Sequence, residues 1–183
     1  MRPRKPLPAL DEEGLYSYAV RLMGRQMRTE SEIRRLLRRR VEADEAGHAR
    51  MEAVIARLKE RRYLDDTGYA QDFTRLRQEN SSFGRRRVQQ DLMRKGVESE
   101  LITKTLDDAY ENVGEEELAR RHLERKRVRK PANEKEAARV VRLLMRAGFS
   151  SSAIFRILKT WDVNQDALTE LELAEPGDET EQN

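Results

Sequence analysis

The chain of 183 residues contains no cysteine, which excludes disulfide bridges, thiol catalysis and cysteine-ligated zinc, and which fits a reducing cytoplasm. Aromatic residues make up only 5% of the chain and hydrophobic residues 37%, which is too little apolar material for one thick globular core. No window of about 18 residues is apolar and uncharged enough to span a membrane. The N-terminus also lacks the hydrophobic stretch of a secretory signal. The composition therefore predicts a cytoplasmic protein built from thin helical modules.

Residues that usually carry chemistry are also scarce. The two histidines, His48 and His122, have no partner at metal-ligand spacing, so both are interpreted as surface or packing residues. The carboxylates Asp65 and Asp66 stand where a helix should begin, and capping explains them without a catalytic role. The sequence has no glycine-rich phosphate loop, and no serine stands beside a candidate base. We therefore predict no enzyme activity, no catalytic or metal-binding residue, no cofactor and no small-molecule substrate.

Charge is abundant and unevenly distributed along the chain. The 37 Lys and Arg residues all precede residue 160, whereas residues 166–183 contain seven acids and no base. With the remaining 27 acids, the first 165 residues carry a charge of +10. A basic body favours a polyanion or an acidic protein surface, although arginine-rich faces also simply keep helices soluble. The role of the acidic tail is open, and one hypothesis is that it competes with DNA for the basic faces.

A short segment of the chain nearly repeats itself. Residues 92–97, Leu-Met-Arg-Lys-Gly-Val, return 52 residues later as Leu-Met-Arg-Ala-Gly-Phe at 144–149. A period of about 50 residues predicts copies of one supersecondary unit, which stack in a line and present long binding surfaces. Hydrophobic residues recur with helical spacing nearly throughout, and no segment is a convincing strand. We predict an all-α fold of three tandem three-helix repeats.

Local signals divide the chain further. Capping boxes open helices at 29–32 and 133–136, Gly96 and Gly148 end helices, and Pro131 ends another. The helix that opens at 29–32 is expected to bury Val41, and the helix that begins at Asp65-Asp66 is expected to bury Leu76. The predicted segments are a basic, proline-rich tail at 1–11, three-helix repeats at 12–62, 63–113 and 114–165, and an acidic, disordered tail at 166–183.

Arginines gather at defined helical positions. Four of them, at 34, 35, 38 and 39, lie opposite an apolar stripe and are expected to form one exposed basic face. Three more, at 85–87, open a helix, where cations cost up to about 1 kcal/mol, so that a partner is indicated. The candidate partner-binding residues are Arg34, Arg35, Arg38, Arg39, Arg75, Arg77, Arg85, Arg86, Arg87 and Lys95.

Aromatic residues that could stack on nucleic-acid bases are few. Tyr63, Tyr69, Phe73 and Phe83 are expected mostly in the core, and Trp161 continues an apolar helix stripe. Base-specific recognition is therefore poorly supported. Contacts to the backbone of single- or double-stranded DNA stay open.

The middle of the chain carries a distinctive set of residues: Tyr63-Leu64-Asp65-Asp66, Tyr69-Ala70, Phe73, Arg77, Gly84, Arg86-Arg87-Val88, Leu92 and Lys95-Gly96-Val97. This set resembles the central signature of the RecX regulators of the RecA recombinase. The first and third units fit the outer repeats of that family more weakly, so that the resemblance covers about residues 12–162. The chain departs from it at Arg85, where the family often has proline, and at Glu98, where a better capping residue is usual.

The resemblance implies an elongated, curved, monomeric array that lies along the RecA filament on single-stranded DNA. Such proteins take part in DNA repair, recombination and the SOS response. They limit filament growth or promote disassembly, and so inhibit ATP hydrolysis, strand exchange and coprotease activity. The residues alone leave two alternatives open: a helical protein that binds DNA directly, and a structural scaffold for another protein.

Overall fold

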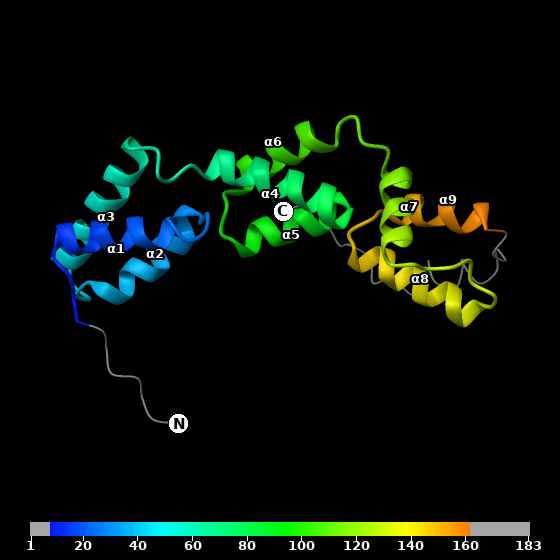
Figure 1. Ribbon diagram of the computed structural model, residues 1–183, viewed down its shortest axis with the longest axis horizontal. Helices are drawn as coiled ribbons and strands as arrows, with labels where there is room; N and C mark the ends of the chain where they lie inside the picture. The colour runs from blue at the N-terminus through cyan, green and yellow to red at the C-terminus, as the bar shows by residue number, and fades with distance from the viewer. Residues whose placement is uncertain (1–7, 162–183) are drawn as a thin grey trace, which may run out of the picture. The chain divides into compact units, whose positions relative to one another are not determined.

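The computed structural model describes residues 8–161, in which the regular elements are all helical (Figure 1). They are α1 (Glu12–Met23), α2 (Glu30–Leu37), the 3₁₀ helix η1 (Arg38–Arg40), α3 (Glu45–Glu60), α4 (Asp66–Ser81), α5 (Arg85–Arg94), α6 (Ser99–Tyr110), α7 (Glu115–Arg125), α8 (Glu134–Arg146) and α9 (Ser151–Thr160). The all-α prediction is thus confirmed. The predicted acidic tail at 166–183 and most of the N-terminal tail lie outside the described residues.

Contacts divide the chain into two compact units. Unit 1 contains the described residues up to Arg75 together with Gln89–Ala109, and unit 2 contains Leu76–Val88 together with the described residues from Tyr110 onward. The division falls within α4, within α5 and before the last residue of α6, so none of these helices belongs wholly to one unit. The repeat boundaries proposed from the sequence stay a prediction.

The main core of unit 1 lies among α1, α2 and α3, which pack together in Figure 1. Leu15 and Ala19 of α1 pack there with Ile33 and Leu37 of α2 and with Leu58 of α3, and all five are buried. Val41 is only partly buried, because α2 ends at Leu37 and the 3₁₀ turn η1 redirects the chain before residue 41. Val41 packs against the same core as expected, but from beyond the end of α2 and not from its buried stripe.

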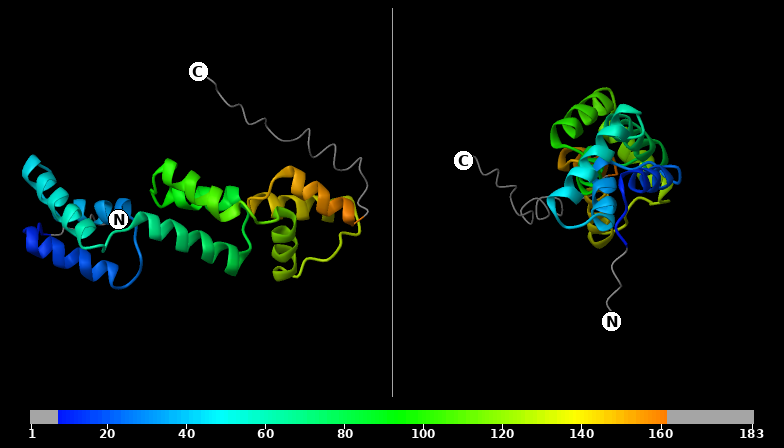
Figure 2. Two further views of the ribbon diagram at one scale, coloured as in Figure 1. Left: turned by 90° about the horizontal axis from the view of Figure 1, so that it is seen from above. Right: turned by 90° about the vertical axis from the view of Figure 1, so that its left-hand side faces the viewer.

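The core of unit 2 is formed by α7, α8 and α9. Leu118, Leu144, Phe149 and Leu158 are buried in it, and Trp161 packs against it from the end of α9. Figure 2 shows α8 and α9 side by side, in agreement with their contacts. The interpretation of Trp161 as a core residue is confirmed.

His122 also packs inside unit 2, as expected from the lack of metal-ligand spacing. Its Nδ1 lies 2.8 Å from the carbonyl oxygen of Ser81, and its ring contacts Phe83 and Phe149. Burial lowers the pKa of His122, because the charged imidazolium is disfavoured away from water. The other histidine, His48, is exposed.

Most of the predicted helix starts are confirmed by hydrogen bonds. The side chains of Thr29, Asp65, Asn133 and Ser150 each accept from a backbone amide three residues later. The reciprocal half of the first capping box is absent, because the Glu32 carboxylate accepts from Lys95 Nζ at 2.9 Å instead. Asp66, by contrast, accepts from the backbone amide of Glu30 at 2.9 Å, at the start of α2. Both aspartates therefore act at helix starts, but on different helices.

Three expectations about individual residues were wrong. Leu76 is 45% exposed and Tyr63 is 51% exposed, so neither belongs to a core. Helix α7 ends at Arg125, before Pro131, because Arg127 takes a left-handed conformation with φ of 53°. Residues 126–130 therefore lie in a turn and loop, and Pro131 does not end the helix.

The predicted helix-ending glycines make close contacts with the helix that lies one repeat earlier. Gly96 has φ of 75°, and a Cβ atom there would lie 2.3 Å from Ser31 Oγ, at the start of α2. Gly148 has φ of 88°, and a Cβ atom there would lie 2.2 Å from the backbone nitrogen of Arg87, at the start of α5. Both positions need glycine for two reasons, the left-handed backbone and the lack of space.

Hydrogen bonds join the same helix ends. Thr29 Oγ1 donates to the Lys95 carbonyl at 2.6 Å, and the Gly84 amide donates to the Ala147 carbonyl at 2.8 Å. The carboxyl end of α5 therefore meets the amino end of α2 in unit 1, and the carboxyl end of α8 meets the amino end of α5 in unit 2. Opposite ends of two helix dipoles attract each other in this arrangement.

Gly148→Ala should lower the free energy of unfolding by about 2 kcal/mol or more. The left-handed backbone costs a non-glycine residue about 1–2 kcal/mol, and the new methyl group would in addition displace Arg87. Urea denaturation measures the change. Gly24→Ala is the matched control, because Gly24 has φ of −64° and its nearest contact would be at 3.5 Å. A loss of similar size in the control would show that the junction is not the cause.

Candidate interaction surface

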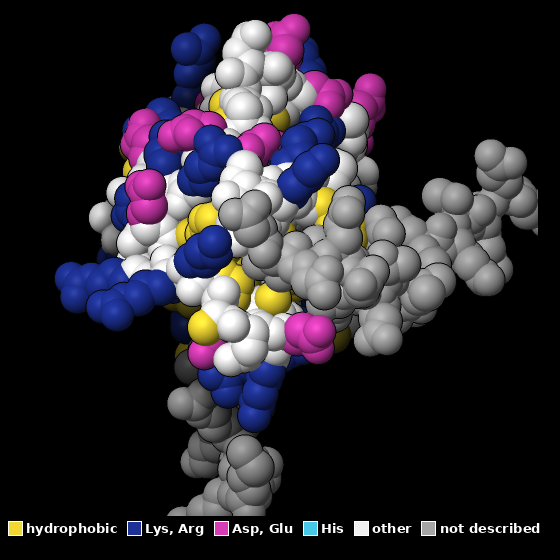
Figure 3. All heavy atoms as spheres, turned by 90° about the vertical axis from the view of Figure 1, so that its right-hand side faces the viewer, with side chains coloured by type: hydrophobic (Ala, Val, Ile, Leu, Met, Phe, Trp, Pro, Cys, Tyr) yellow, Lys and Arg dark blue, Asp and Glu magenta, His cyan; other side chains and the backbone are white. Residues whose placement is uncertain are grey.

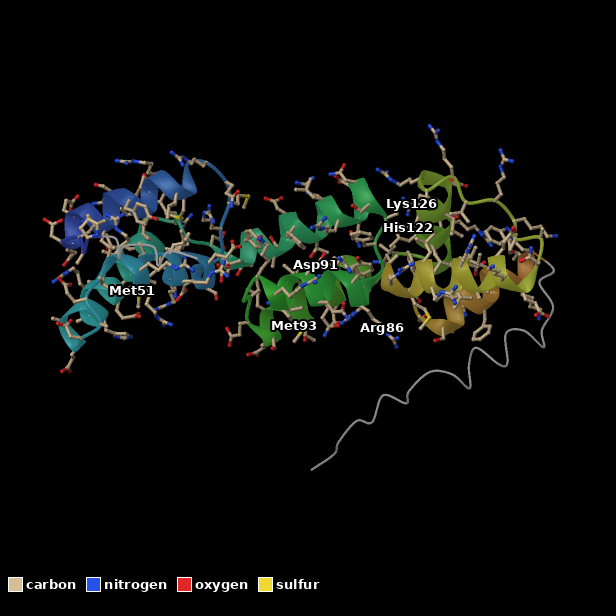
Figure 4. The ribbon with its side chains drawn as sticks, turned by 90° about the horizontal axis from the view of Figure 1, so that it is seen from below. Met51, Arg86, Asp91, Met93, His122 and Lys126 are labelled. Atoms are coloured by element: carbon tan, nitrogen blue, oxygen red, sulfur yellow. The ribbon has the colours of Figure 1, made fainter. Side chains whose placement is uncertain are left out.

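The three arginines that open α5 differ in their surroundings. Arg86 is exposed and points away from the helix (Figure 4), whereas Arg85 and Arg87 are partly buried. The guanidinium carbons of Arg77 and Arg87 lie 5.8 Å and 5.6 Å from the centre of the Phe83 ring, within cation–π distance. Arg77 and Arg87 therefore pack within unit 2, and Arg86 is the member of this group that is open to a partner.

The position of α5 supplies a structural reason for basic residues at its start. The last carbonyl groups of α8 lie at this helix end, and Gly84 and Arg87 are in direct contact with Ala147 and Gly148. The partial negative charge of the α8 carboxyl end offsets the unfavourable placement of cations at a helix amino end. The local electrostatics therefore do not require an external partner for residues 85–87.

Arg34 does not belong to the exposed basic face that was expected on α2. Its Nε donates to Glu30 Oε1 at 2.7 Å, and its Nη1 donates to Glu52 Oε1 of α3. Burial raises the pKa of Glu30, but hydrogen bonds from Lys59 and Arg34 outweigh it and leave the pKa below its usual value. The hydrogen bond from Arg34 likewise lowers the pKa of Glu52. Arg34 thus joins α2 to α3.

The remaining arginines of that predicted face are exposed. Arg35 lies on α2, and Arg38 and Arg39 lie on η1. None of the three has an ion pair within residues 8–161. Their charges are therefore available to a partner, whereas the charge of Arg34 is neutralised by Glu30 and Glu52.

Two further candidates pair with acids inside unit 1. Lys95 donates to Glu32 at 2.9 Å, and this hydrogen bond raises the pKa of Lys95 above its usual value. Arg75 pairs with Asp72 at 2.9 Å. Lys95 therefore helps to hold α5 on α2, and the charge of Arg75 is partly neutralised.

The structure also shows a basic stripe on α8 that was not predicted from the sequence. Its residues are Lys135, Arg139, Arg142 and Arg146, all exposed and without an acidic ion-pair partner in the described part of the chain. They recur at i, i+4, i+7 and i+11, opposite the buried Val140 and Leu144. This helical spacing of cations was the signal that could have revealed the stripe.

Unit 1 also contains an apolar groove that was not predicted from the sequence. It has a volume of about 500 Å³ and is lined by Val20, Met23, Met27, Tyr63 and Tyr69, among others. Met27 and Tyr63, which are 57% and 51% exposed, both line this groove. Spacing alone could not have revealed the groove, because its walls come from helices that are distant in sequence.

Within residues 8–161, no group of three or more acids and histidines could hold a metal ion. No helix in the same range is long and apolar enough to cross a membrane. Paired helix ends, small cores and basic solvent faces define a helical repeat protein with surfaces suited to binding.

Comparison with known proteins identifies the family. Models of the second and third three-helix domains of RecX match residues 65–106 and 114–158. Over 163 residues the chain is 31% identical to the regulatory protein RecX of Mycolicibacterium smegmatis, covering 86% of this chain and 85% of that protein. It is 33% identical to the protein of that name from Trichlorobacter lovleyi over 148 residues, covering 79% and 93%. The chain therefore belongs to the RecX family of regulatory proteins, which confirms the resemblance.

Other relatives are longer, and solved structures share the fold. The chain spans only 57% of the regulatory protein RecX of Oceanobacillus iheyensis, to which it is 30% identical over 161 residues. A crystal structure of regulatory protein RecX superposes with a TM-score of 0.64 at 25% identity, covering 81% of this chain and 71% of that one. RecX from Lactobacillus salivarius superposes with a TM-score of 0.62 at 21% identity, covering 83% and 97%, and supports the fold alone.

Replacing Arg34 with alanine should destabilise unit 1 by about 1 kcal/mol at neutral pH, as expected for partly exposed ion pairs. The pKa values of Glu30 and Glu52 are lowered in the folded state, so their stabilisation is complete above the unfolded value of 4.5. It is lost as the pH falls through the lowered values. The difference between wild type and Arg34→Ala should therefore shrink below about pH 4.

Urea denaturation at neutral and acidic pH measures this difference. Arg35→Ala is the matched control, because Arg35 is the neighbouring residue and has no ion pair in the described part of the chain. It should change the stability little at either pH. A pH-independent loss in Arg34→Ala would show that packing, and not the charge pairs, accounts for the role of Arg34.

Proposed function

We propose that this protein is a non-enzymatic modulator of the RecA recombinase that acts in the cytoplasm as a monomer. It binds the RecA filament on single-stranded DNA and limits filament growth, ATP hydrolysis, strand exchange and coprotease activity. The observation that carries the proposal is membership of the RecX family over most of the chain. Exposed cations on both units, without acidic ion-pair partners among residues 8–161, support a partner with an acidic surface.

The contacts divide the candidate residues into two groups. Arg34, Arg77, Arg87 and Lys95 make contacts within the protein, so their loss would disturb the fold. The exposed residues Arg35, Arg38, Arg39 and Arg86 are the ones we assign to direct contact with the filament. Arg75 and Arg85 have other interactions within the protein and are assigned a supporting role.

The experiment that tests the proposal is RecA-dependent ATP hydrolysis on single-stranded DNA, with this protein added in amounts well below that of RecA. Binding to naked DNA is measured at the same salt concentration. Hydrolysis that falls while naked-DNA affinity stays weak supports a filament modulator. Undiminished hydrolysis at every ratio would reject it.

Arg86→Ala should weaken inhibition about fivefold, equivalent to about 1 kcal/mol for one charged contact. Helicity and thermal stability should stay the same, because Arg86 is exposed at the start of α5. Lys104→Ala on α6 is the control, since Lys104 is also exposed and its replacement removes the same charge. Equal effects of the two variants would show that net charge, and not the position of Arg86, decides the inhibition.

A second candidate function, direct binding to nucleic acid, is favoured by the basic stripe on α8. Four cations in phosphate contact should give a slope of log affinity against log salt of about −3 for single-stranded DNA. Arg139→Ala together with Arg142→Ala should reduce the slope by about 1.4. Tight, salt-dependent binding to naked DNA with no effect on RecA would replace the first proposal with this one.

A further inference from the structure

The basic stripe on α8 differs from other solvent-exposed faces of unit 2. On those faces, arginines form ion pairs with glutamates. Arg120 and Arg121 of α7 each pair with a glutamate four residues earlier, and Arg156 of α9 pairs with Glu116. The four cations of the stripe have no such partner within the described residues. At spacings of three and four residues their charges also repel one another. Among the described residues, these arginines of α7 are therefore neutralised by glutamates, whereas the cations of the α8 stripe are not.

The chain itself supplies a polyanion of suitable charge. Residues 166–183 contain seven acids and no base: Asp166, Glu170, Glu172, Glu175, Asp178, Glu179 and Glu181. They follow α9, and α9 packs against α8 in the core of unit 2. The segment therefore follows a helix that packs against α8 within unit 2, on the side opposite the stripe, whatever the placement of unit 1.

The lengths are compatible with contact along the whole stripe. From Lys135 to Arg146 the helix rises by about 17 Å, at about 1.5 Å per residue. An extended chain covers about 3.3 Å per residue, so six residues span that distance and the remainder of the segment is available for the connection. The acids are spread through the segment, so that several can face the stripe together.

An apolar contact is available beside the charges. Met145 on α8 is 40% exposed, next to Arg146, and the acidic segment contains Leu168, Leu171 and Leu173. Figure 3 shows lysine and arginine side chains next to exposed hydrophobic side chains on a face of unit 2. A surface of this kind fits a segment in which acids alternate with leucines better than it fits a purely charged chain.

We propose that residues 166–183 dock on the α8 stripe of the same molecule and cover it until a stronger polyanion displaces them. The segment would then set the affinity of this face for acidic partners. The inference rests on the charges and connectivity of this chain and does not depend on RecA being the partner.

Paramagnetic labelling of the 183-residue protein tests the proposal. Because the chain has no cysteine, Gln182→Cys provides a unique site for a spin label. At low salt, amide signals of α8 should lose more than half of their intensity. At about 1 M salt, where the Debye length is about 3 Å, they should recover. Unchanged α8 signals at low salt would overturn the proposal.

Two matched charge reversals locate the docking face. Arg139→Glu, Arg142→Glu and Arg146→Glu together should abolish the effect of the label. Arg35→Glu, Arg38→Glu and Arg39→Glu change the net charge equally in unit 1 and should leave it intact. The reverse result would overturn the assignment to α8.

Two further samples control for misfolding and for docking between molecules. Glu170→Gln, Glu172→Gln and Glu175→Gln together remove three of the seven negative charges of the segment without changing a described helix, and they should strongly weaken the effect. This variant guards against misfolding of the α8 variant. A mixture of isotope-labelled protein without the spin label and spin-labelled protein without the isotope should show no loss of α8 signals. A loss in the mixture would mean docking on a second copy and would overturn the intramolecular proposal.

Discussion

A glycine with positive φ lets the carboxyl end of α5 meet the amino end of α2, and a second one lets α8 meet α5 in the same way. Any side chain larger than hydrogen at either position would collide with the earlier helix. Carbonyl oxygens at one helix end accept from donors at the other, such as Thr29 Oγ1 and the Gly84 amide. Gly96 and Gly148 are therefore the positions at which one helix end packs closely on an earlier helix.

This junction decides which cations stay available for binding. Lys95 lies at the α5–α2 contact and pairs with Glu32, and Arg87 lies at the α8–α5 contact and packs on Phe83. Lys95 and Arg87 therefore use their charged groups in contacts within the protein. Arg86, one residue from Arg87, faces solvent instead. Neighbouring arginines in one basic run thus take different roles, because successive residues on a helix point in different directions.

Unit 2 distributes charge differently on adjacent helices. On α7, arginines follow glutamates by four residues and are neutralised locally, which is sufficient for a solvated face. On α8, the same spacing joins cations to cations. An anion from elsewhere, whether from the chain itself or from a partner, would relieve the repulsion among these cations. The membership of this chain in a regulatory family is consistent with a face that exchanges one anion for another.

The sequence by itself determined the helical fold, the period of the repeat, most helix starts and the two helix-ending glycines, because these depend on residues within a few positions of each other. The family could also be recognised from the central motif. The tertiary structure alone decided which cations pair with acids on other helices. Arg34 is neutralised by Glu52 and Lys95 by Glu32, partners that are 18 and 63 residues away. No helical spacing encodes such pairs, since they arise only when separate helices pack.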